Sequence, residues 1–161
     1  MSFNLDSVHE NSNYISTSHS SVQTTSSSAN TFITLNGSEI NYSPSQNATN
    51  VIYEISFYGE QLGKPFIVAQ LEHYTSGAWS EINEKYRRNF GLGNATAAGR
   101  WNRFPIYWRF ILPAWSGEKS LRIRLGSPNA NNEMDLHQIS TWDGTSSSTT
   151  FCNTNLFIYS I

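Results

Sequence analysis

The sequence predicts an all-β protein: an antiparallel β-sandwich of the jelly-roll type that follows an extended N-terminal arm. Two observations predict this class. Short segments alternate apolar and polar residues between frequent Gly, Pro, Asn and Ser turn signals, and no segment has a clear helical period. Aromatic residues and charged residues each make up 14% of the 161 residues, with Ser, Thr and Asn abundant, which is typical of β-proteins that work through their surfaces.

Residues 1–30 are expected to form the arm. Ten of the thirteen residues from Ser16 to Ser28 are Ser or Thr. Such a segment cannot bury enough apolar surface to offset the entropy of ordering it, so alone it should be flexible or extended. Sparse apolar residues could anchor it on a partner, among them Phe3, Leu5, Tyr14 and Ile15.

Residues 31–161 are expected to form the sandwich domain. The clearest strand spans residues 51–58, where Val51, Tyr53, Ile55 and Phe57 share one apolar face. The dipeptide Asn36-Gly37 marks a tight turn between two shorter strands. In the first half of the domain the predicted strands are residues 31–35, 39–42, 51–58, 66–74 and 78–82.

The second half begins with residues 83–103, which are expected to be a long irregular excursion with one helical turn at 95–98. Residues 143–149 read as a Ser/Thr-rich loop. The strand at 104–112 places Phe104, Trp108 and Phe110 on one inward side. Predicted strands here are residues 104–112, 120–125, 136–141 and 156–161.

The last predicted strand is apolar on almost both faces. Leu156 and Ile158 lie on one side, and Phe157, Tyr159 and Ile161 on the other. Both faces should therefore be covered, either inside a sheet or by a neighbouring subunit, and a subunit is the favoured cover. The residues expected at the interface are Tyr107, Leu156, Phe157, Ile158, Tyr159 and Ile161.

Charge is unevenly distributed although the net charge is only −2. Residues 1–63 contain no Lys or Arg, and residues 64–124 contain all ten. These regions could be complementary surfaces in an oligomer, or could mix on one surface. The overall acidity argues against nucleic acid as a partner. The N-terminus has no signal-peptide pattern, and no apolar run is long enough for a membrane helix.

The sequence contains no constellation that indicates an enzyme. It has no Gly-x-Ser-x-Gly elbow, no P-loop and no dinucleotide fingerprint. The four histidines lack the spacing of a zinc site, so neither a metal nor a cofactor is expected. The single cysteine, Cys152, gives no disulfide framework and is expected to be a small buried side chain.

One segment, residues 86–115, concentrates eight aromatic residues and five arginines. Four interpretations are open: core plus subunit interface, plain core with solvated arginines, glycan contact, and nucleic-acid stacking. A ligand or partner surface in this segment would include Arg88, Trp101 and Arg103.

Two stretches carry a resemblance to known proteins. Residues 37–44 with 51–57 look like the opening of domains in virion proteins of marine phages and large algal viruses. Residues 121–126, followed by Trp142-Asp143-Gly144 and the terminal strand, are similar in layout to trimeric jelly rolls of the C1q and tumour-necrosis-factor type. In that fold a late strand runs near the trimer axis, with aromatic residues packed between subunits.

The resemblance implies a non-enzymatic virion structural protein: a homotrimer on the particle exterior, assembled in the host cytoplasm, that decorates and cements the capsid. The arm would hold capsid or other virion proteins. The alternative is a fibre-tip or lectin-like module that binds a host receptor or glycan through residues 86–115.

Overall fold

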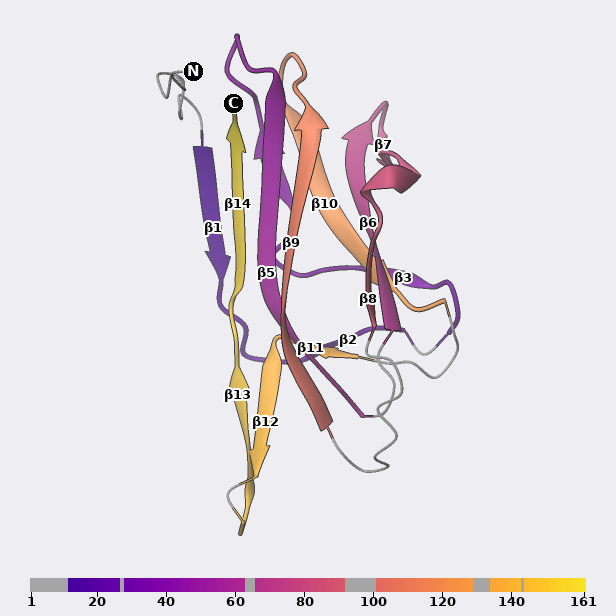
Figure 1. Ribbon diagram of the computed structural model, residues 1–161, viewed down its shortest axis with the longest axis vertical. Helices are drawn as coiled ribbons and strands as arrows, with labels where there is room; N and C mark the ends of the chain where they lie inside the picture. The colour runs from indigo at the N-terminus through magenta and orange to yellow at the C-terminus, as the bar shows by residue number, and fades with distance from the viewer. Residues whose placement is uncertain (1–11, 27, 63–65, 92–100, 129–133, 143) are drawn as a thin grey trace, which may run out of the picture.

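The computed structural model describes residues 12–26, 28–62, 66–91, 101–128, 134–142 and 144–161, with only the backbone of residues 61, 62, 101, 102 and 142. Two antiparallel sheets face each other across one apolar core (Figure 1). The predicted class, an all-β antiparallel sandwich, is confirmed. No helix in the described part of the chain is both long and apolar enough to cross a membrane.

The first sheet is built around β5, the long strand that the alternation of residues 51–58 predicted. Its main order is β1-β14-β5-β9, and the short β11 and β2 continue it beside the far end of β5. Its strands are β1 (Ser12–Thr17), β2 (Gln23–Thr24), β5 (Asn50–Leu62), β9 (Trp101–Pro113), β11 (Asp135–Leu136) and β14 (Thr154–Ser160).

The second sheet has β10 and β6 at its centre. Strands β3 and β4 both pair with one edge of β10, while β7 and β8 pair with β6. Its strands are β3 (Phe32–Thr34), β4 (Ile40–Tyr42), β6 (Phe66–Thr75), β7 (Ala78–Glu81), β8 (Arg88–Gly91) and β10 (Lys119–Gly126). One 3-10 turn, η1 (Glu84–Tyr86), connects β7 to β8.

The connectivity follows the jelly-roll pattern. Setting aside the short β2 and β11 and the β12–β13 hairpin, and counting β3–β4 and β7–β8 as one strand each, leaves eight principal strands in the described part of the chain. Their orders are first-eighth-third-sixth in one sheet and second-seventh-fourth-fifth in the other. Between the seventh and eighth, β12 (Gln138–Trp142) and β13 (Ser147–Phe151) form a hairpin that projects beyond the sandwich (Figure 1).

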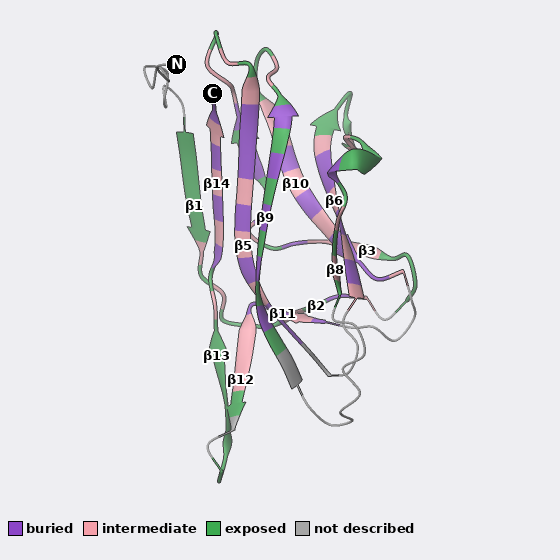
Figure 2. Ribbon diagram, in the orientation of Figure 1, coloured by how far each residue is buried: buried purple, intermediate pink, exposed green. Residues whose placement is uncertain are grey.

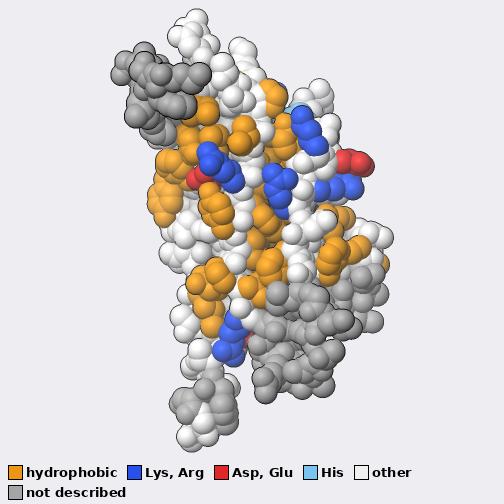
Figure 3. Space-filling view, in the orientation of Figure 1, with side chains coloured by type: hydrophobic (Ala, Val, Ile, Leu, Met, Phe, Trp, Pro, Cys, Tyr) orange, Lys and Arg blue, Asp and Glu red, His pale blue; other side chains and the backbone are white. Residues whose placement is uncertain are grey.

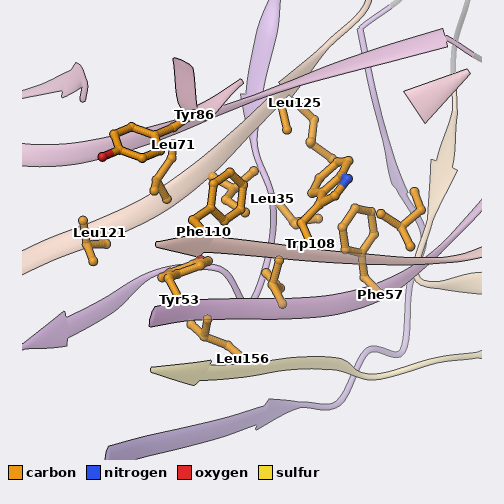
Figure 4. Packing of buried hydrophobic residues seen from close by; sticks show 14 of the residues in the cluster. Leu35, Tyr53, Phe57, Leu71, Tyr86, Trp108, Phe110, Leu121, Leu125 and Leu156 are labelled. Atoms are coloured by element: carbon orange, nitrogen blue, oxygen red, sulfur yellow. The ribbon is translucent and has the colours of Figure 1, made fainter. Parts of the chain in front are cut away.

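The core lies between the sheets and is formed by alternate residues of each strand. Figure 2 shows this as buried bands that repeat along β5, β9 and β14. Tyr53, Phe57, Trp108 and Phe110 contribute rings that meet edge-on, such as Tyr53 and Phe110 with centroids 5.9 Å apart (Figure 4). Burial of these rings is therefore the main reason for the alternation in the sequence.

Two backbone positions show how glycine shapes the sheets. Ser76 and Gly77 both have positive φ, 53° and 84°, and form the tight turn between β6 and β7. At Gly126 a Cβ would lie 2.8 Å from the carbonyl oxygen of Thr31 and 2.9 Å from the Phe32 ring. Only glycine lets β3 approach β10 this closely.

The described part of the expected arm is docked on the sandwich of its own chain. β1 pairs along its whole length with β14, and β2 pairs with β11. The edge of β14 offers hydrogen-bonding groups that β1 satisfies, so a Ser/Thr-rich sequence becomes a strand by pairing rather than by burial. Of the expected anchors, Tyr14 and Ile15 lie in β1, 61% and 37% exposed. Phe3 and Leu5 lie outside the described residues.

Two predictions for irregular segments were wrong in part. Within 83–103, residues 88–91 form β8 at the edge of the second sheet, whereas 95–98 lie outside the described residues. Within 143–149, residues from Ser147 onward form β13, which is exposed along its length. β8 and β13 are paired strands with little apolar alternation, so the sequence pattern did not indicate them.

Candidate interaction surface

The outer face of the first sheet carries an unusual number of large apolar side chains. We call this surface the aromatic face. Figure 3 shows hydrophobic side chains spread over β1, β14, β5 and β9, with a few charged groups among them. Its members are Tyr14 (β1), Ile52 and Glu54 (β5), Tyr107, Arg109 and Ile111 (β9), and Phe157 and Tyr159 (β14).

Strand register brings these residues together in rows across four strands. One row runs Tyr14, Phe157, Glu54 and Arg109, and the adjacent row includes Tyr159, Ile52 and Ile111. The Tyr14 and Phe157 rings have centroids 6.3 Å apart, and those of Phe157 and Tyr159 are 5.2 Å apart. Directly opposed residues on one face of a sheet pack against each other, so the rings form one continuous layer.

Much of this layer remains exposed in the single chain. Tyr14 is 61% exposed, Tyr107 60% and Ile111 53%. Ile52 differs, because its neighbours in the layer leave only 2% of it exposed although it lies outside the core cluster. An apolar layer on a sheet face that otherwise borders solvent is typical of an interaction surface.

The charged groups at the centre of the aromatic face are paired with each other. Arg109 Nε lies 3.1 Å from Glu54 Oε1, and the Tyr159 hydroxyl lies 3.4 Å from the same carboxylate oxygen. Arg109 also donates to the Tyr159 hydroxyl at 3.3 Å. Burial, reinforced by the negative charge of Glu54, raises the pKa of Tyr159, so its hydroxyl stays neutral. The face can therefore be covered without leaving an unpaired charge.

A shallow depression of about 100 Å³ lies within the aromatic face. Tyr14, Tyr107 and Phe157 supply its apolar walls, and Glu54 and Asn155 its polar groups. The Tyr14 hydroxyl donates to Asn155 Oδ1 at 2.9 Å, which holds β1 against β14 on this side. A protruding side chain from another molecule would fit a depression of this size.

The residues predicted for a subunit interface divide into two groups. Tyr107, Phe157 and Tyr159 come together on the aromatic face, and Ile161 follows at its end, 44% exposed. The prediction that Leu156 and Ile158 lie at the interface was wrong. Both are fully buried in the core of their own chain, because the even-numbered positions of β14 point between the sheets.

Of the residues proposed as a ligand surface in segment 86–115, Arg88 and Arg103 each have partners within the fold. Arg88 lies over the Phe110 ring at 4.8 Å and donates to the Arg109 carbonyl, so it connects β8 to β9. Arg103 is paired at 2.8 Å with the fully buried carboxylate of Glu60. The Trp101 side chain lies outside the described residues. Within this segment the core interpretation holds for Phe104, Trp108 and Phe110, which are buried.

A second polar cluster, which we call the histidine pair, fixes the link between β1 and β2. His19 stacks on His137 with centroids 3.8 Å apart and planes 10° apart. His19 Nε2 and His137 Nδ1 both contact the Thr154 hydroxyl, at 3.0 and 3.1 Å. Desolvation, together with the neighbouring His19, lowers the pKa of His137 to about 4, so the pair is neutral at pH 7.

The tautomer of His137 follows from its neighbours. Gln23 Nε2 donates to the Thr34 carbonyl and Gln23 Oε1 accepts from the Asn36 amide, which orients the Gln23 side chain. His137 Nε2 lies 3.0 Å from the same Gln23 Oε1 and must therefore carry the proton. His137 also has a φ of 68°, which only the surrounding contacts can maintain in a non-glycine residue.

Sequence reasoning predicted three of the eight residues of the aromatic face, Tyr107, Phe157 and Tyr159, as interface residues. Alternation indicated that Phe157 and Tyr159 share one side, but not which side is the core. Tyr14 was predicted only as an anchor of the arm, and Ile52 and Ile111 were not identified, because only the register among β1, β14, β5 and β9 brings the three together. Their apolar character at outward positions of strands was the available signal.

The described residues contain no group of three or more His, Cys, Asp or Glu side chains that could hold a metal ion. Cys152 is half-buried, and burial raises the pKa of its thiol.

No protein-family model and no curated protein matches this sequence.

Proposed function

We propose that this chain is a non-enzymatic structural protein that assembles as a homotrimer through the aromatic face. The observation that carries the proposal is the exposed layer of Tyr14, Tyr107 and Ile111 around an internally paired Glu54–Arg109 centre. Exposing such a sheet face to water costs free energy, and contact with other copies of the chain removes that cost.

Covering the exposed side chains of the aromatic face supplies part of the free energy of assembly. A tyrosine side chain that is 60% exposed leaves on the order of 100 Å² uncovered. Covering that area contributes about 2 kcal/mol per ring at roughly 25 cal/mol per Å². Tyr14, Tyr107 and Ile111 together could therefore supply about 5 kcal/mol per subunit before the entropy cost of association.

The fuller proposal is a virion-surface protein of the decoration or cement type, with the part of the chain before β1 contacting capsid proteins. The trimeric state is what the C1q-like resemblance implies, and the neighbouring rings of Phe157 and Tyr159 on the outer face of β14 support a role for this strand in assembly. The virion context rests on the resemblance of residues 37–44 and 51–57 alone.

Sedimentation equilibrium tests the assembly. The wild-type chain should have three times its mass of 18.2 kDa. Tyr107→Glu should give a folded monomer, because a carboxylate buried opposite another apolar layer costs several kcal/mol. Tyr74→Glu is the matched control, since Tyr74 is 46% exposed on β6 of the other sheet. A wild-type monomer, or a trimer that survives Tyr107→Glu, would contradict the proposal.

The alternative is a lectin-like module, and the depression on the aromatic face favours it over the other non-assembly functions. Tyr14, Tyr107 and Phe157 beside Glu54 and Asn155 combine stacking rings with hydrogen-bonding groups. A glycan array probed with wild-type protein and Tyr107→Ala distinguishes the two functions. Sugar binding by a wild-type monomer that is lost in Tyr107→Ala supports the lectin, whereas a trimer without sugar binding supports assembly.

A further inference from the structure

A recess opens between the two sheets where β9 ends and β10 begins, at the upper end of the sandwich in Figure 1. Its volume is about 250 Å³. The lining comes from both sheets and includes His73 (β6), Ile82, Leu112 (β9), Trp115, Lys119 and Leu121 (β10). Leu112 and Leu121 are buried at its floor, and Ile82 and Trp115 are half-buried at its walls.

The recess has an apolar interior and a basic rim. The ammonium of Lys119 lies 5.4 Å from the centre of the Trp115 ring. It forms no salt bridge with a carboxylate of the described residues. Three acidic groups are adjacent in sequence to lining residues. Glu72 pairs with Arg122 and Glu81 with Arg87, whereas the exposed Glu118 forms no salt bridge with a described residue.

Trp115 is held in place as a wall of the recess. Its indole nitrogen is 3.4 Å from the Tyr42 carbonyl oxygen, and its ring meets the Tyr42 ring edge-on at 6.3 Å. Trp115 also lines a more polar depression of about 460 Å³, with Ser45, Gln46 and Ser116 among its other residues. A fixed aromatic wall gives the apolar recess a defined shape, which is suited to a ligand with a flat apolar body.

We propose that this recess binds a small apolar anion, a molecule with a ring or short hydrocarbon body and one carboxylate or sulfonate. The body would lie on Leu112, Leu121 and Trp115, and the anionic group would meet the Lys119 ammonium. The volume is slightly below the usual range for drug-sized ligands, so a compact body is expected. The site is formed by one chain and does not include the aromatic face, so it goes beyond the assembly function.

A pair of probes with the same ring system tests the proposal in the full chain. We take 2-naphthoate as the anion and 2-naphthalenemethanol as its neutral counterpart. Isothermal titration calorimetry measures affinity, and the indole N–H signal of Trp115, assigned with Trp115→Phe, reports the location by NMR. Wild-type protein should bind 2-naphthoate saturably, more tightly than the alcohol, and with a shift of the Trp115 signal.

Variants separate the charge from the cavity. Lys119→Met should weaken 2-naphthoate by about fivefold, the scale of a partly exposed ion pair, and leave the alcohol unchanged. Lys85→Met is the matched control, since its ammonium also lies over a ring, that of Tyr86, but outside the recess. Ala114→Phe should abolish binding of both probes by filling the recess. Absence of saturable binding, or binding of 2-naphthoate by Lys119→Met as tight as wild type, would overturn the proposal.

Discussion

Acid should weaken the fold through the histidine pair. His137 has a lowered pKa of about 4 in the folded protein, against 6.5 for an ordinary histidine. Between these values the unfolded chain binds a proton that the folded chain does not, so stability falls as the pH drops from 6.5 towards 4. Protonation would also place two positive rings 3.8 Å apart.

The magnitude follows from the same two pKa values. At about 1.4 kcal/mol per pH unit, the difference sets an upper limit of about 3 kcal/mol for the complete loss. By pH 5 the upper limit on the loss of stability is about 2 kcal/mol. Solvent reaches the pair through the half-buried His19 and screens the charge, so the loss is smaller than this limit. For a chain of this length the melting temperature should fall by roughly 4–6 °C between pH 7 and pH 5.

Thermal unfolding followed by circular dichroism between pH 7 and pH 5 is the assay. His137→Asn should flatten most of the pH dependence, and asparagine tolerates the positive φ of this position. His73→Asn is the comparison and should flatten less of the pH dependence: burial and Lys119 lower the pKa of His73 too, but this half-buried side chain lies outside the histidine pair. A His137→Asn protein as sensitive to acid as wild type would refute the reasoning.

Further predictions concern the ion pairs of β9 and the glycine of β10. Glu60→Gln should cost about 3 kcal/mol in urea unfolding, because the buried carboxylate pairs with Arg103 and also accepts from the Ser140 amide and hydroxyl. Glu54→Gln should cost under about 1 kcal/mol, because it alters the half-exposed ion pair of Glu54 with Arg109 between the same two strands, β5 and β9. Equal losses of stability in Glu60→Gln and Glu54→Gln would contradict this expectation. Gly126→Ala should cost about 2 kcal/mol, because its Cβ would press on the Thr31 carbonyl. Gly117→Ala should cost about 1 kcal/mol, because a Cβ there meets open space but φ is 76°. A larger loss of stability in Gly117→Ala than in Gly126→Ala would contradict this order.

The strands that could be predicted from the sequence are those that bury one face. Residues 51–58, 104–112 and 120–125 alternate strongly, and the structure places strands on all three. β1 and β13 were missed because their side chains are mostly exposed and their order comes from pairing with β14 and β12. Such strands have no signal of their own in a single sequence.

The same limit applies to the candidate surfaces. The composition of the terminal strand indicated that both of its faces are apolar and need cover. One of these two faces packs in the core. The histidine pair joins residues 118 positions apart, and the recess joins β6, β9 and β10. Contacts of this kind depend on the topology of the whole sandwich, which alternation alone does not determine.

Hydroxyl-radical footprinting of the native protein tests the central claim, that the aromatic face is covered by other copies of the chain. In the isolated chain Tyr107 is 60% exposed and Tyr74 is 46% exposed, so both should be labelled comparably in dilute solution. As concentration rises through the assembly range, we expect labelling of Tyr107 to fall several-fold while that of Tyr74 is unchanged. Labelling of Tyr107 that stays equal to that of Tyr74 at every concentration would contradict the account.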